Sequence, residues 1–100
     1  MEIDRVFTLP LLFVGGFAHP PNADAVLWFA KEVFPKIREQ IKVNFYIVGS
    51  KVTDEIKALE QPGNGIIVKG FVSEEELADL YRNCRIVVVP LRYGAGVKGK

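Results

Sequence analysis

The stretch Leu11-Leu12-Phe13-Val14-Gly15-Gly16 decides the fold of this chain. Four large apolar residues stand in a row between Pro10 and two glycines. A short apolar run of this kind predicts a strand that is buried on both faces, and such a strand belongs inside a parallel sheet with helices above and below it. Ligands of open α/β sheets bind beyond the carboxyl ends of the strands, so Gly15 and Gly16 mark a candidate binding loop.

The composition is that of one globular domain. The chain has 100 residues, 49% of them hydrophobic, and its 13 basic and 12 acidic residues leave a net charge of +1. This balance argues against a nucleic-acid-binding arm or a polybasic membrane patch. The single cysteine, Cys84, excludes an internal disulfide and a cysteine metal cluster, and it favours a reducing compartment. No signal peptide or transmembrane segment is evident, so we expect a cytoplasmic protein.

Alternating strand and helix patterns follow the opening stretch. Asn22 is a good N-cap, and the residues after it that recur at helical spacing should face inward: Val26, Phe29, Ala30, Val33, Phe34 and Ile37. Pro35 should bend that helix near residues 31–35. Ser73 and Glu76 have the spacing of a capping box, and the helix that it opens should turn Leu77, Leu80, Tyr81 and Cys84 inward. After the first strand at Leu11–Gly16, the expected elements are a loop through Phe17–Pro21, a helix over 22–39, a strand at Val43–Val48, a helix over Asp54–Glu60, a strand at Ile66–Lys69, a helix over 74–83 and a strand at Ile86–Val89.

This alternation predicts an α/β fold in three layers, a Rossmann-like half domain with a four-stranded parallel sheet of order 3-2-1-4 and helices on both faces. The first strand would then be central and the most buried. We assign residues 1–10 to an N-terminal arm and residues 11–100 to the domain. The loops after the first and fourth strands should meet where the strand order reverses.

The second glycine-rich loop, Gly94–Gly99, has the literal pattern G-x-G-x-x-G. A nicotinamide-binding fingerprint is disfavoured, because that motif belongs in the first strand–helix turn. No Ser or Thr follows Lys98, so the loop is not a Walker motif. Two interpretations stay open: a flexible terminal loop, or a loop that approaches a phosphate with Lys98 and Lys100 as cations.

Three other polar residues carry weaker signals. His19, the only histidine, is either an anion contact beside Gly16 or a solvent-exposed loop residue. Cys84 is expected in the core rather than as a nucleophile. Ser50 has no base within sequence reach, so no hydrolase triad is predicted, and we expect no metal site or cofactor.

Several segments together resemble a known family. They are Leu12–Phe17, Pro21-Asn22, Phe45–Ser50, Gly70–Ser73 with Leu77 and Tyr81, and Val89–Lys100. In this order and spacing they are similar to the C-terminal donor-binding domain of group 1 (family 4) retaining glycosyltransferases of the GT-B type. The resemblance covers Leu11 to Lys100, and its last segment is the most specific.

The resemblance implies a set of residues that bind a nucleotide-sugar. The loop after the first strand would lie near the diphosphate, the segment after the third strand beside the nucleobase, and the last loop at the sugar and phosphates. Many family members have an arginine where Gly16 stands, so Lys98 is the expected cation. The implied site residues are Gly15, Gly16, Phe17, Phe71, Val72, Tyr93, Gly94, Ala95, Gly96 and Lys98.

The resemblance also implies an activity. The parent protein would be a retaining glycosyltransferase that moves a sugar from a UDP-, GDP- or ADP-linked donor to a glycan or lipid-linked acceptor. We predict no catalytic residue in this chain, and we expect the chain alone, as a fragment of that enzyme, to be inactive. The alternative is a nucleotide-binding or structural α/β module without transfer activity. The apolar edge of residues 86–89 further suggests a homodimer.

Overall fold

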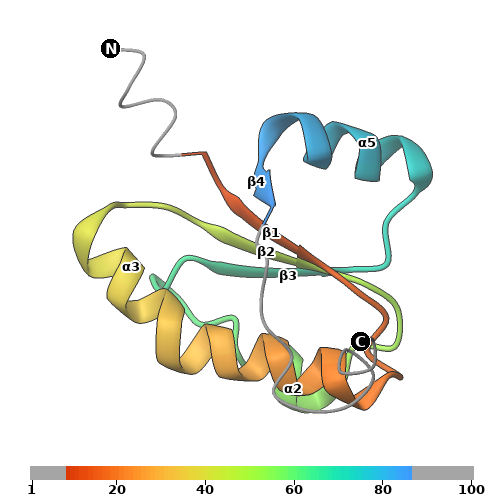
Figure 1. Cartoon of the computed structure of the whole chain (residues 1–100), viewed down its shortest axis with the longest axis horizontal. Coiled ribbons are helices and arrows are strands. Elements are labelled where there is room, and N and C mark those ends of the chain that lie inside the picture. The colour runs from red at the N-terminus through yellow and green to blue at the C-terminus, as the bar shows by residue number, and fades with distance from the viewer. Residues whose placement is uncertain (1–8, 87–100) are drawn as a thin grey trace, which may run out of the picture.

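The computed structural model describes residues 9–86, shown in colour in Figure 1. Its strands are β1 (Leu11–Val14), β2 (Phe45–Val48), β3 (Ile66–Gly70) and β4 (Arg85–Ile86). Its helical segments are α2 (Pro20–Trp28), the π-helix η1 (Phe29–Val33), α3 (Phe34–Gln40), α4 (Asp54–Lys57) and α5 (Glu74–Asn83).

The sheet is parallel throughout. β1 pairs with β2 from Leu11 opposite Phe45 to Val14 opposite Val48, and β2 pairs with β3 on its other side. β4 lies beside β1 on the free side, where Leu11 and Leu12 pair with Arg85 and Ile86. The predicted parallel α/β sheet is therefore confirmed, whereas the continuation of the fourth strand to Val89 lies outside the described residues.

Helices cover both faces of the sheet, as Figure 1 shows with α5 on one side and α2 and α3 on the other. In β1 and β2 the odd-numbered residues Phe13, Phe45 and Ile47 pack into the larger core with α4 and with the long helix that α2, η1 and α3 form. The even-numbered residues of these two strands face the other way, where Leu12 and Val48 pack against α5. This alternation follows from the period of two along a strand, and it produces three layers.

The prediction that β1 is the most buried strand is wrong. β2 has three buried residues of its four, whereas β1 has two, and Val14 at its end is 38% exposed. β1 pairs with β4 over only two residues, while β2 has a full neighbour on each side. Burial of a strand depends on its neighbours as well as on its own hydrophobicity.

The long helix begins earlier than predicted. His19 is the N-cap of α2 and Pro20 is its first residue, so Pro20 and Pro21 are not in a loop. Proline suits these positions because the first N–H groups of a helix have no partner within the helix and its fixed φ matches the helix. Asn22, predicted as the N-cap, lies inside the first turn.

The predicted irregularity before Pro35 takes the form of a π-turn. The Phe34 N–H donates to the Phe29 carbonyl oxygen, five residues back, and α3 resumes with Pro35 in its first turn. Proline has no N–H to donate to the preceding turn, so the wider turn accommodates it without breaking the helix. Of the apolar residues predicted to face inward, Val26, Phe29, Ala30 and Phe34 are buried, whereas Val33 and Ile37 are half-buried against the core.

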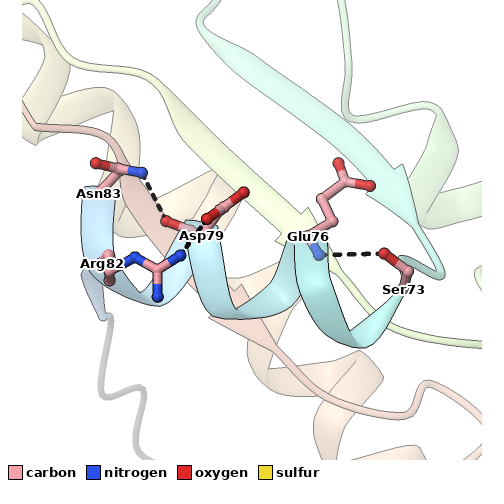
Figure 2. Close-up of polar contacts among 5 residues, drawn as sticks. All are labelled: Ser73, Glu76, Asp79, Arg82 and Asn83. Carbon is pink, nitrogen blue, oxygen red and sulfur yellow. Dashed lines mark hydrogen bonds and ion pairs between the residues drawn. The ribbon is translucent and has the colours of Figure 1, made fainter.

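α5 begins and ends where the sequence predicted. Figure 2 shows the Ser73 hydroxyl accepting a hydrogen bond from the Glu76 N–H, at 3.1 Å. The Glu76 carboxylate instead forms an ion pair with Lys69, 3.5 Å away. Only half of the predicted capping box is therefore formed. Tyr81, predicted to face inward, is 45% exposed.

Replacing Ser73 with alanine should lower the free energy of unfolding by about 1 kcal/mol, because the Glu76 N–H loses its acceptor. Urea denaturation followed by circular dichroism measures this change. Ser73→Asp is the matched control, since its carboxylate can accept the same hydrogen bond and should retain the stability. Equal stability of the alanine and aspartate variants would contradict the assigned cap.

Candidate functional site

Glycine turns at the carboxyl ends of three neighbouring strands form one continuous rim. The Gly15 N–H donates to the Val48 carbonyl oxygen at 3.0 Å, and the Gly49 N–H donates to the Gly70 carbonyl oxygen at 2.8 Å. These bonds extend the pairing of β1, β2 and β3 past the ends of the strands. The rim therefore presents backbone at the edge where α/β sheets bind ligands.

Gly49 lies at the closest approach within this rim. A Cβ atom at Gly49 would be 1.6 Å from the Gly15 carbonyl oxygen and 2.8 Å from the ring of Phe17. No side chain fits in that space. Gly49 thus allows the turns after β1 and β2 to pack against each other.

The turn after β1 is also tied to the start of α2. The Gly16 carbonyl oxygen accepts from the side-chain amide of Asn22 at 3.0 Å and from the His19 N–H at 3.3 Å. The Phe17 N–H donates to the Ser50 carbonyl oxygen at 3.0 Å. With the Gly15–Val48 bond included, three backbone hydrogen bonds and one side-chain hydrogen bond therefore hold this turn in place.

Two of the predicted site residues in this turn have different surroundings. Gly16 is exposed at the rim, whereas Phe17 is 3% exposed and stacks on Phe13 with ring centroids 5.9 Å apart. The Phe17 side chain is part of the core, so a ligand could reach only its backbone. The His19 side chain is exposed, which both of its interpretations allow.

The predicted nucleobase segment begins directly after β3. Gly70 has a φ of +72°, a conformation that favours glycine, and it turns the chain out of the sheet. Phe71 is 80% exposed, while Val72 is half-buried against the α5 side of the sheet. The structure thus places an exposed aromatic ring at the same edge as the Gly15–Gly16 turn. The other predicted site residues, Tyr93, Gly94, Ala95, Gly96 and Lys98, lie outside the described residues.

Cys84 is half-buried beside α5 and packs with the smaller core. Burial raises the pKa of its thiol above the usual value, and the charge of Lys69 opposes this shift. A raised pKa keeps the thiol protonated and weakens it as a nucleophile. This environment agrees with a structural cysteine.

Within residues 9–86 there is no group of three His, Cys, Asp or Glu side chains able to hold a metal ion. In the same range, none of the helices has the length and apolar character needed to cross a membrane. A hollow of about 330 Å³ lies between α4 and β3, and among its lining residues are Lys57, Lys69 and Gly70. It touches the glycine rim only at Gly70.

Sequence reasoning missed the roles of Asn22 and Gly49. Asn22 has the residue type of an N-cap, and only the early start of the helix at Pro20 gives its side chain another partner. Gly49 directly follows an apolar strand, as Gly15 does, and this place in the sequence could have identified it as part of the binding edge.

The comparisons with known proteins agree with this picture. Residues 9–100 match the family described as "Glycosyl transferases group 1". The chain is similar to an "Uncharacterized 44.6 kDa protein in cps region" of Klebsiella pneumoniae, with 32% identity over 96 residues. That alignment covers 90% of this chain and 25% of the relative, so the chain spans about a quarter of that protein's length. No solved structure matches. The match along nearly the whole chain shows that it belongs to the group 1 glycosyltransferases.

Proposed function

We propose that this chain binds the nucleoside diphosphate of a nucleotide-sugar, as part of the donor-binding domain of a retaining glycosyltransferase of the GT-B type. The proposal combines membership of the group 1 family with the glycine rim at the carboxyl edge of the sheet. The acceptor would be a glycan or a lipid-linked glycan, and the relative from a cps region supports a role in polysaccharide synthesis.

The observation that carries the proposal is the Gly15–Gly16 turn. It is exposed at Gly16, lacks a side chain that would keep a ligand away, and is held in place by hydrogen bonds to β2 and α2. A diphosphate needs close approach to backbone N–H groups, and glycine permits that approach. The turn after β1 is therefore the proposed diphosphate site.

The remaining parts of the proposed site surround this turn. Phe71, which is 80% exposed, would supply an apolar surface beside the nucleobase, together with the backbone at Val72. Lys98 would supply the positive charge that Gly16 cannot, and the loop Tyr93–Gly96 would contact the sugar. In this proposal β4 continues through residues 86–89 as a full fourth strand. A homodimer through that edge is a separate proposal, since the edge lies beyond the described residues.

Titration of the chain with UDP, GDP and ADP, followed by amide chemical shifts, tests the proposal. At millimolar nucleotide we expect shifts at Gly15, Gly16 and Val72. The amide of Phe45, which bonds to the Gly65 carbonyl oxygen at the opposite edge of the sheet, is the internal control and should not shift. Binding should be weak, because ordering loops costs conformational entropy.

The outcome separates the competing functions. If none of the three nucleotides shifts the rim, the donor-site proposal is wrong and a structural module is favoured. A shift without sugar transfer by the parent protein would favour a nucleotide-binding module.

A further inference from the structure

Asn22 holds a position that the family resemblance does not explain. It lies half-buried in the first turn of α2, and its side-chain nitrogen is 3.0 Å from the Gly16 carbonyl oxygen. The same nitrogen lies 3.3 Å from the place that a Cβ atom on Gly15 would occupy. One amide group therefore binds Gly16 and occupies the space that a side chain at Gly15 would need.

The Asn22 hydrogen bond fixes the direction of the peptide between Gly16 and Phe17. The Gly16 carbonyl points toward α2, where Asn22 and the His19 N–H bind it. In a planar trans peptide the N–H points opposite to the carbonyl, and the next N–H, that of Phe17, does donate away from α2 to Ser50.

The same rule orients the N–H of Gly16. The Gly15 carbonyl oxygen lies against Gly49 on the β2 side, since a Cβ on Gly49 would be 1.6 Å from it. The Gly16 N–H must then point away from β2, toward the side where β4 lies. Within residues 9–86 this N–H has no hydrogen-bond acceptor, so it is available to a ligand at the rim.

We propose that Asn22 is a positioning residue: by fixing the Gly16–Phe17 peptide it limits rotation at Gly16, and so it keeps the preceding Gly16 N–H directed at the diphosphate of the bound nucleotide. This inference rests on the proposed function. Backbone N–H groups that are already held in a fixed direction bind phosphate oxygens more tightly, because no free energy is lost in reorganising the turn on binding. Loss of the Asn22 amide would let the Gly16–Phe17 peptide rotate, and this would loosen the turn that carries the Gly16 N–H.

The variant Asn22→Ala tests the proposal in two measurements. Amide hydrogen exchange at Phe17 and His19 should become about tenfold faster, because both bonds depend on the Gly16 peptide, whereas exchange at Phe45 should not change. The dissociation constant of whichever of UDP, GDP and ADP binds the unmodified chain should rise about threefold to tenfold, the loss expected for one hydrogen bond.

Two further variants control the measurement. Asn83→Ala removes the same kind of bond, from an asparagine side chain to the Asp79 carbonyl oxygen at 2.8 Å in α5 (Figure 2), and should alter neither readout. Asn22→Asp keeps the shape of the side chain but cannot donate, and its charge favours the start of a helix. It should repeat the faster exchange at Phe17 and His19 in a folded chain.

Each outcome is decisive. Unchanged exchange at Phe17 and His19 in both Asn22 variants would overturn the proposal, and so would faster exchange with unchanged nucleotide affinity in Asn22→Ala. Failure of the unmodified chain to bind all three nucleotides would instead overturn the proposed function, and that result is obtained before any variant is made.

Discussion

Replacing Gly49 with alanine is expected to lower the free energy of unfolding by about 2–4 kcal/mol. The new Cβ would lie 1.6 Å from the Gly15 carbonyl oxygen and 2.8 Å from its carbonyl carbon. Both are backbone atoms, and the Gly15 N–H is bound to Val48, so the clash can be relieved only by separating the ends of β1 and β2. Chemical denaturation measures the loss.

Gly16→Ala is the matched control for this prediction. A Cβ at Gly16 has Ser50 Oγ as its nearest neighbour, at 3.7 Å, which is ordinary contact. The stability of this variant should change by less than about 1 kcal/mol. If the two alanine variants were equally stable, the close approach of Gly49 to Gly15 would be wrong.

Replacing Phe45 with alanine should have a comparable or larger effect, a loss of about 3–5 kcal/mol. Phe45 is 0% exposed, and its ring centroid lies 5.1 Å from that of Phe29 and 5.4 Å from that of Phe34. It joins β2 to η1 and α3. Its removal would leave a cavity between the sheet and the long helix, which adds to the loss of buried apolar surface.

The measurement compares two phenylalanines in one chain. Phe71→Ala, at an 80% exposed position, should leave the free energy of unfolding within about 0.5 kcal/mol of the unmodified chain. Because a loss of this size can unfold a marginally stable domain, Phe45→Leu should be measured as well, with an expected loss of about 1–2 kcal/mol. A Phe45→Leu variant as stable as Phe71→Ala would contradict the assigned core.

The sequence alone was sufficient for the class of fold. A short apolar run such as Leu11–Val14, followed by glycines and a helical pattern, admits few structures other than a parallel strand with its crossover helix. Local signals also determined the bounds of α5, because Ser73 caps its own helix through a bond to Glu76 three residues away. Such features depend on residues that are near one another in the chain.

The tertiary structure decided what depends on distant residues. Contacts between separate segments make β2 more buried than β1. Such contacts also require glycine at position 49, because Gly15 lies against it. They likewise give the Asn22 side chain a partner at Gly16, so that it does not cap its helix. The pattern of a strand shows which side chains are apolar, but it does not show how many neighbours will cover them. The glycine rim is likewise visible in sequence as separate glycines, and only the parallel register of β1, β2 and β3 brings these turns together, because equivalent ends of parallel strands lie at one edge of the sheet.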